Sequence, residues 1–367
     1  MFRAIVSRGL GPLALSPRGY FAYNINIVNK RTAAATELMQ KILLAIALIV
    51  SSATGLLAQL DVTFVNVGQG DAIFIEFPNG KRALIDGGNS GVLIDNFLRS
   101  KGVTRLDFVA LTHPHSDHYR GLKKVFSNYQ VDNYYDTRAE NIDAKGDNNL
   151  RELAAAEPGC KTHYPKPGDI LNWDPKVTVK VFNACWEPVQ MRDNDETNNC
   201  SLVMRLYYNG NGVLFTGDAN SEMEADMLRH FKSGLQSNIL KVGHHGSRTS
   251  TSDAFLARVR PDYAFISVGQ NNKYGHPHQD TLSRLINAGA EIYLTTAGTQ
   301  SFTIPAPDKN LPGPVKPIIR TEIGEMAEMG PLTRLVPVSV TWDPAELMNS
   351  DSPALDQLRG EAATVSD

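Results

Sequence analysis

Four side chains of the kinds that bind metal ions lie within the six-residue segment 113–118, namely His113, His115, Asp117 and His118. The largely apolar run 106–110 precedes this segment and predicts a buried strand, so the four side chains follow a strand end. The fixed strand end and the restricted backbone of Pro114 leave the loop little conformational freedom to lose when imidazole and carboxylate groups converge. This density of ligands favours two metal ions over one.

Two later strand ends carry further residues of this kind. Asp218 follows an apolar run that ends at Phe215, and a carboxylate can bridge two cations and lower their mutual repulsion. His244 and His245 follow a second run, 239–242. The order and spacing of the three segments predict one composite site, in which either of the two adjacent histidines is the ligand.

The elements that must position these residues fall into two groups of strands accompanied by helices. Alternating or continuous apolar runs bounded by turn residues predict strands, and apolar residues at helical spacing predict helices. Strand groups with helices outside them predict an α+β fold, a four-layer αββα sandwich. The expected strands are 62–67, 72–77, 82–86, 106–110, 177–182, 201–208, 212–216, 263–268 and 292–295, and the expected helices are 92–100, 121–126, 221–231, 252–259 and 280–288.

This pattern resembles the metallo-β-lactamase superfamily over about residues 60–305. The superfamily's His-x-His-x-Asp-His, Gly-Asp and later His are matched by His113, His115, Asp117, His118, Asp218 and the pair His244/His245. Within the superfamily, five segments are similar to the hydrolase domain of the ComEC family of DNA-uptake channels: 67–72, 197–203, 214–219, 241–247 and 274–278. We expect a free-standing, exported relative without the channel.

The resemblance implies a role for each of these residues. It implies one metal ion held by His113 and His115, and a second held by Asp117, His118 and one of His244/His245, with Asp218 bridging the two. Asp86 matches the family's first motif and is expected to orient the ligand loop. The implied cofactors are two divalent metal ions, Zn²⁺ or Mn²⁺.

One departure concerns the first metal ion. The superfamily usually supplies a third histidine there, and this chain has Asn198, Asn199 and Ser201 at the matching place. Amides and hydroxyls are weaker ligands than imidazole, so we expect weaker binding, or compensation by His276, and a wider metal choice that includes Mn²⁺. His276 is otherwise a candidate for contacting a substrate phosphate or protonating the leaving group. Asn198, Asn199 and Ser247 would donate hydrogen bonds to an anion.

These roles predict metal-assisted hydrolysis, in which a hydroxide shared by two cations attacks in line and Asp117 or Asp218 accepts the proton of the water. The expected substrate is a phosphodiester, with DNA as one option, and no obligate protein partner is evident. Because the formal net charge is −3, a nucleic acid would have to be held by a local patch and by metal. Two alternatives stay open: a hydrolase of a lactam, lactone or phosphocholine ester, and a non-catalytic DNA-binding module.

The chain divides into four expected parts. Residues 1–38 are an extension, unstructured or created by a misassigned start, and residues 39–58 predict a signal peptide. Its apolar run is shorter than the roughly 20 residues that span a bilayer, which favours cleavage and a periplasmic, cell-surface or secreted protein with no stable membrane span. The alternative is anchoring by an uncleaved N-terminal helix. Residues 59–305 form the hydrolase domain, and residues 306–367 are a Pro-rich linker and tail.

Three cysteines in an exported chain predict one disulfide and one free thiol. Cys160 lies in a connection rich in proline and glycine, and Cys185 lies at the end of the strand 177–182, so we pair these two. The resemblance places Cys200 beside the active site as a free thiol.

Overall fold

The computed structural model describes residues 39–42, 59–142, 146–191, 193–231, 233–307 and 315–322. Residues 39–42 are helical, and none of the described helices is long and apolar enough to cross a membrane. The expectations for the extension 1–38, for most of the signal segment and for residues 323–367 lie outside the described residues.

The first sheet has eight strands in the order β19-β18-β1-β2-β3-β5-β7-β9. One half is antiparallel and the other is parallel, with the change at β3. Its strands are β1 (Leu60–Phe64), β2 (Ile73–Glu76), β3 (Arg82–Ile85), β5 (Phe108–Ala110), β7 (Asn133–Tyr135), β9 (Lys161–His163), β18 (Thr299–Ile304) and β19 (Ile318–Glu322). The pairing of β19 with β18 carries this sheet beyond residue 305, where the sequence placed the domain boundary.

The second sheet has seven strands in the order β10-β11-β13-β14-β15-β16-β17, of which the last four are parallel. They are β10 (Ile170–Asp174), β11 (Val177–Asn183), β13 (Val203–Tyr208), β14 (Asn211–Phe215), β15 (Ile239–Lys241), β16 (Tyr263–Ile266) and β17 (Glu291–Leu294). Two small pairs complete the strands of the described residues: β4 (Arg105–Leu106) with β6 (Gln130–Val131), and β8 (Ala139–Asn141) with β12 (Val189–Met191).

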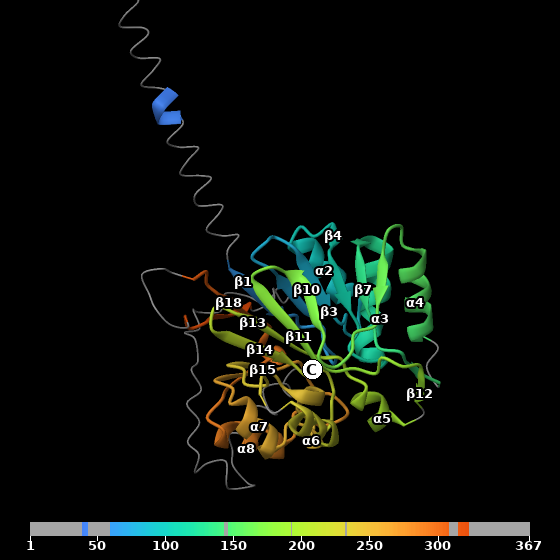
Figure 1. The fold of residues 1–367 in the computed structure, drawn as a ribbon, viewed down its shortest axis with the longest axis vertical. Coiled ribbons are helices and arrows are strands. Elements are labelled where there is room, and N and C mark those ends of the chain that lie inside the picture. Colours follow the sequence, from blue (N-terminus) through green and yellow to red (C-terminus); the bar gives the residue numbers. More distant parts are fainter. Residues whose placement is uncertain are drawn as a thin grey trace, which may run out of the picture. The chain divides into compact units, whose positions relative to one another are not determined.

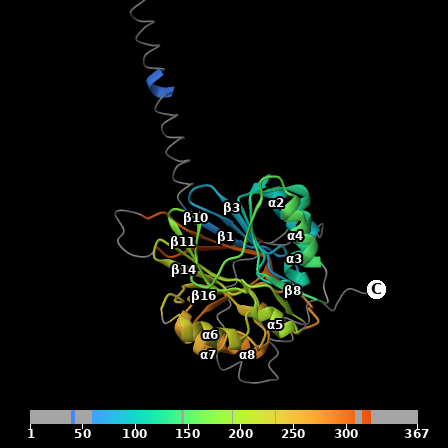
Figure 2. The ribbon, with the colours of Figure 1, turned by 45° about the vertical axis from the view of Figure 1, so that its right-hand side comes forward.

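Helices cover the outer face of each sheet, on opposite sides of the domain (Figures 1 and 2). On the first sheet these are α2 (Gly91–Ser100), α3 (Ser116–Asn128) and α4 (Gly146–Ala156), and on the second α6 (Ser221–His230), α7 (Asp253–Val259) and α8 (Gln279–Asn287). The short helical elements of the described residues are α5 (Asn194–Asn199) and the 3-10 turns η1 (Gly243–Gly246) and η2 (Thr295–Ala297). The α+β fold with its four-layer αββα order is therefore confirmed.

Strand periodicity decides which side chains enter the layer between the sheets. In β14, Val213 and Phe215 belong to the cluster between the sheets, while Leu214 belongs to the helix-covered cluster. The stacked rings of Phe64 and Phe265, with centroids 4.5 Å apart, join the two sheets across this layer. Because successive side chains of a strand point to opposite faces, Lys241 lies on the same inner face as Ile239. The sequence of β15 thus directs a lysine between the sheets.

The disulfide joins Cys185 to Cys200, with their Cα atoms 5.0 Å apart, and Cys160 is the free thiol. The predicted pairing of Cys160 with Cys185 is wrong, and so is the expectation that Cys200 is free. Cys160 packs in the helix-covered core of the first sheet, whereas Cys185 follows β11 in the second. Cys200 caps α5, which is held beside the end of β11 by hydrogen bonds from the Asn183 amide to the carbonyls of Asn199 and Ser201.

Candidate metal centre

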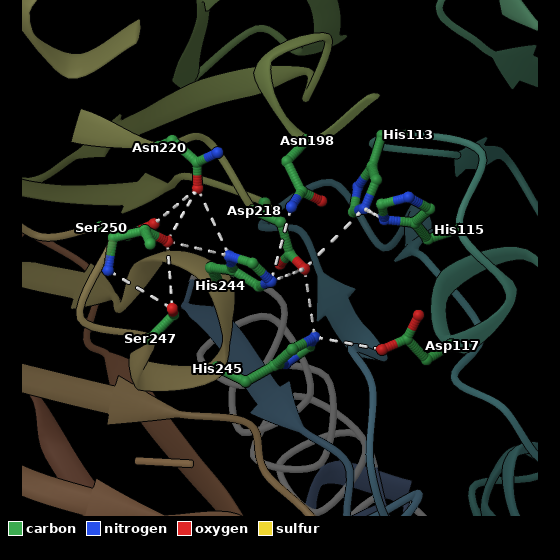
Figure 3. Close-up of polar contacts among 12 residues, drawn as sticks. His113, His115, Asp117, Asn198, Asp218, Asn220, His244, His245, Ser247 and Ser250 are labelled. Carbon is green, nitrogen blue, oxygen red and sulfur yellow. Dashed lines mark hydrogen bonds and ion pairs between the residues drawn. The ribbon is translucent and has the colours of Figure 1, made fainter. Parts of the chain in front are cut away.

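The segments that the sequence singled out meet at the carboxyl ends of the parallel strands, around the side chain of Asp218 (Figure 3). Oδ2 of Asp218 lies 3.3 Å from Nε2 of both His118 and His245. Nε2 of His113 is 3.8 Å from the same oxygen and Nε2 of His244 is 3.9 Å from it. One carboxylate oxygen therefore faces four imidazoles, which come from the loop after β5, from the first turn of α3 and from the turn after β15.

Close packing of the backbone brings the ligand segments together. Helix α3 begins at Ser116, earlier than the sequence predicted, so Asp117 and His118 project from its first turn. Gly70 lies against this turn so closely that a β-carbon on it would stand 2.1 Å from the carbonyl oxygen of Asp117. His244 and His245 both adopt left-handed φ values, +49° and +55°, an uncommon conformation for non-glycine residues.

Asp117, His118 and His245 form one group whose ligand atoms lie within 4.8 Å of one another. The Nδ1 atom of His118 is 2.8 Å from Oδ2 of Asp86, and Nδ1 of His245 is 2.8 Å from the carbonyl of Ser267. Both acceptors fix one proton on Nδ1, so in the neutral ring Nε2 is the nitrogen whose lone pair would bind a metal ion. Among the described residues these two buried Nε2 atoms have no hydrogen-bond partner, which suits a metal ligand.

His113 and His115 form the second part of the centre, with Nε2 of His113 2.9 Å from Nδ1 of His115. The Thr112 hydroxyl donates to Asp86, so it accepts from Nδ1 of His113 at 3.1 Å and leaves Nε2 of His113 without a proton. Two ring nitrogens at this distance need a proton or a cation between them. The donor set of imidazole nitrogens and carboxylate oxygens fits divalent metal ions.

Charges in the centre are strongly coupled. Burial alone would raise the pKa of the Asp218 carboxyl, but His245, His118 and Lys241 outweigh it and hold that pKa well below its usual range. Burial would lower the pKa of His245, and the charge of Asp218 raises it instead to about 10. Burial lowers the pKa of His113 and of His115. The centre thus attracts positive charge, and protons compete with metal ions for it.

Asp86 is fully buried behind the ligand loop at the end of β3. Its Oδ1 accepts from the backbone N–H of Thr112 at 2.8 Å, and its Oδ2 accepts from the Thr112 hydroxyl at 2.7 Å. With the contact to His118, one carboxylate fixes both ends of the segment 112–118. This placement is that of a residue which orients ligands rather than one which binds metal directly.

Asn198, Asn199 and Ser201, which match the place of the superfamily's third histidine, differ from one another in orientation. Asn198 is buried and faces the centre, with its Nδ2 atom 3.5 Å from Nε2 of His244. Asn199 turns away, and its Oδ1 accepts from the backbone N–H of Asn220. The Ser201 hydroxyl accepts from the backbone N–H of Asp218 at 2.9 Å and so fixes the turn that carries this aspartate.

His276 and Ser247 border the centre without contacting Asp218. The ring of His276 lies 5.5 Å from that of His244 between centroids, and its pKa is lowered to about 4, first by burial and then by His244. The Ser247 hydroxyl contacts that of Thr249 at 3.0 Å. Asn220, which the sequence did not single out, places its Oδ1 3.3 Å from Nδ1 of His244 (Figure 3).

Two further residues that the sequence did not single out are Asp71 and Lys241. Both are buried behind Asp218, and Nζ of Lys241 is 2.5 Å from Oδ2 of Asp71. A lysine inside the apolar run 239–242 is unusual for a buried strand. This lysine is the feature of the sequence from which the pair could have been predicted.

A family profile described as the metallo-beta-lactamase superfamily matches residues 65–270, more than half of the chain. This chain therefore belongs to that superfamily of metal-dependent hydrolases, as the motifs predicted.

Among curated relatives, ComE operon protein 3 of Bacillus subtilis (strain 168) is 30% identical over 255 residues, which cover 64% of this chain and 32% of the relative. Competence protein ComA of Neisseria gonorrhoeae is 28% identical over 237 residues, with coverages of 64% and 30%. The chain thus spans about a third of the length of these ComEC-like relatives. The solved structure of the metallo-beta-lactamase fold protein YhfI from Bacillus subtilis is similar with a TM-score of 0.43 and 12% identity, over 64% of this chain and 96% of YhfI.

Proposed function

We propose that this chain is an exported, metal-dependent phosphodiesterase that cleaves DNA or another phosphodiester. Membership of the superfamily and the convergent ligand set support the metal-dependent hydrolysis. The observation that carries the phosphodiester part is the position of Asn198. Asn198 stands where the superfamily usually has a third histidine. Its amide is a weaker metal ligand than imidazole, and its N–H group, a hydrogen-bond donor, points toward the space beside His244. A donor at that place suits an anionic phosphoryl oxygen.

The residues divide between two metal ions, Zn²⁺ or Mn²⁺. His113 and His115 would hold the first ion, and Asp117, His118 and His245 the second, with Oδ2 of Asp218 between them. His245 is better placed than His244, because it is fully buried and its Nε2 lies within 3.4 Å of both Asp117 and Asp218. When bound, such ions lower the pKa of water and neutralise charge on the phosphoryl group.

The carboxylates orient the attacking water. Asp117 is the more accessible of the two acidic residues, with 23% of its side chain exposed against 3% for Asp218. Burial would raise its pKa, but the nearby imidazoles of His245 and His118 outweigh that effect and lower it. Asp117 therefore stays ionised at neutral pH and would orient the water by accepting a hydrogen bond from it. We also assign the proton of the water to Asp117, on the ground of its accessibility and not of its pKa. Asp218 is the alternative acceptor.

Neutral donors complete the substrate side of the site. The Nδ2 atom of Asn198 faces the centre, and Nδ1 of His276 is buried with no hydrogen-bond partner among the described residues. We assign Asn198 to a phosphoryl oxygen and His276 to the oxygen of the leaving group. The Ser247 hydroxyl contacts that of Thr249, which donates to Asn220 beside His244.

DNA is the first natural substrate to test, because relatives of this chain include a protein named for competence. The formal net charge of −3 offers no general attraction for nucleic acid, so binding would depend on the metal ions and on local donors. Export is proposed from residues 39–58, most of which lie outside the described residues.

A substrate panel tests this proposal. Purified protein loaded with Mn²⁺ or with Zn²⁺ is assayed on bis-(p-nitrophenyl) phosphate, single-stranded DNA, p-nitrophenyl phosphocholine and a chromogenic β-lactam. We expect cleavage of the two phosphodiesters and none of the β-lactam. Asn198→Ala is expected to lower kcat/KM for the phosphodiesters with its metal content unchanged, because Asn198 contacts substrate and not metal. Turnover of the β-lactam without phosphodiester cleavage would contradict the assignment.

A further inference from the structure

A lysine side chain is sealed directly behind the candidate metal centre. Lys241 ends β15 on the face between the sheets, and none of its surface is exposed. Its Nζ atom donates to the carbonyl of Gly217 at 2.8 Å, and it lies 2.5 Å from Oδ2 of Asp71 and 3.5 Å from Oδ1 of Asp218. The neighbouring positions of this strand are filled by isoleucine, leucine and valine, so packing of the strand does not require a charge here.

The two oxygens of Asp218 face different kinds of charge. Oδ2 faces the imidazoles of His118 and His245, and those of His113 and His244 somewhat farther away. Oδ1 faces Lys241, and no described residue forms a hydrogen bond with this oxygen. One oxygen is thus directed to the expected metal ions and the other to the ammonium group.

Asp71 would otherwise extend the metal centre toward the core. Its carboxylate forms one group with Asp218 and His245 and another with Asp86 and His118, and in each group the ligand atoms lie within 4.8 Å of one another. Buried carboxylates arranged in this way are strong ligands for a divalent cation. The ammonium of Lys241 lies between Asp71 and Asp218, in contact with the first and near the second.

We propose that Lys241 is a built-in cation that occupies a third cation position behind the centre. It neutralises Asp71, keeps Oδ1 of Asp218 away from metal, and leaves Oδ2 as the only bridging oxygen. Lys241 is in this sense a positioning residue that limits the number of metal ions the centre takes. The inference rests on the metal-dependent function proposed above, but it concerns the number and affinity of ions rather than the substrate.

Metal counting tests this role without an activity assay. Wild type, Lys241→Met, Asp71→Asn and the double variant are dialysed to equilibrium against the same free Mn²⁺ or Zn²⁺ concentration, and bound metal per chain is measured by mass spectrometry of the digested protein. Methionine is unbranched like lysine, is one atom shorter, and carries no charge. We expect Lys241→Met to bind one more ion than wild type and the double variant to return to the wild-type number, because it lacks the Asp71 carboxylate.

Asp71→Asn gives a second readout that does not require Lys241→Met to fold. Without Asp71 the ammonium is balanced by Asp218 alone, so we expect the metal Kd to rise by roughly tenfold or more, the scale seen when outer partners of metal sites are removed. The double variant should recover most of that loss. An unchanged metal number in folded Lys241→Met, or an unchanged Kd in Asp71→Asn, would overturn the role of Lys241 alone. A wild-type chain that binds no divalent metal would overturn the proposed function as well.

Discussion

The imidazole of His118 and the carboxylate of Asp86 are both fully buried, and Nδ1 of the histidine lies 2.8 Å from Oδ2 of the aspartate. The same carboxylate accepts two hydrogen bonds from Thr112, so it sets the ring orientation and the ligand loop together. A residue outside the ligand set thereby decides which nitrogen of His118 faces the centre.

Asp86→Ala is predicted to weaken metal binding about 10–100-fold, because loss of such a partner frees the tautomer and orientation of the ligand. The measurement is a chelator competition that gives the metal Kd. Asp226→Asn, a change at an exposed carboxylate on α6, is the control and is expected to leave the Kd unchanged. Equal Kd values for Asp86→Ala and wild type would show that Asp86 does not orient the ligands.

Gly70→Ala is predicted to destabilise the fold by roughly 1–3 kcal/mol more than a glycine-to-alanine change without steric contact, because its β-carbon would meet the carbonyl of Asp117. Gly168→Ala is the matched control, since Gly168 also has a positive φ, +99°, and nothing lies within 4 Å of its added β-carbon. Urea unfolding of the two variants provides the comparison. Similar losses of stability in both variants would mean that the positive φ of Gly70, and not its contact with helix α3, determines the cost of alanine at this position.

The sequence predicted the fold and the main ligand positions because both follow from local patterns. Alternating or continuous apolar runs define the strands, and the histidines and aspartates come shortly after those runs. The contacts of Lys241 depend instead on elements far apart in the sequence. Strands β14 and β15 must lie side by side before Lys241 meets the turn at Asp218, and the two sheets must face each other before it meets Asp71. The disulfide was missed for the same reason: only the packing of α5 against the end of β11 shows that Cys200 is beside Cys185.

Removal of the disulfide is predicted to lower the free energy of unfolding by about 2–4 kcal/mol, as expected when a cross-link no longer restricts the unfolded chain. Cys185→Ser/Cys200→Ser is compared with Cys160→Ser, which is expected to have a much smaller effect because that thiol is free. Mass spectrometry of unreduced peptides should also detect the 185–200 linkage. Detection of a linkage to Cys160 in its place would contradict the structure.

Acid stability is predicted to depend on Asp95, which joins α2 to the end of α3. Hydrogen bonds from Asn128, first, and from Arg99 and Tyr129 lower its pKa to about 2. Because the folded pKa is below that of the unfolded chain, its contribution to stability is present above about pH 4 and is lost as the pH falls toward 2. The stability difference between wild type and Asp95→Asn should therefore shrink over this range in urea titrations. A stability difference that does not change with pH would contradict this prediction.

Metal-dependent hydrolysis at this site is tested most directly with bis-(p-nitrophenyl) phosphate as substrate. Its hydrolysis is compared for metal-free protein, for protein reloaded with Mn²⁺ or Zn²⁺, and for His115→Ala treated in the same way. Circular dichroism establishes that the variant is folded. We expect turnover in the reloaded wild type, none in excess chelator, and none in folded His115→Ala, because His115 contributes the nitrogen that faces Nε2 of His113. Full turnover in chelator, or unchanged turnover in His115→Ala, would contradict a metal-dependent hydrolase at this site.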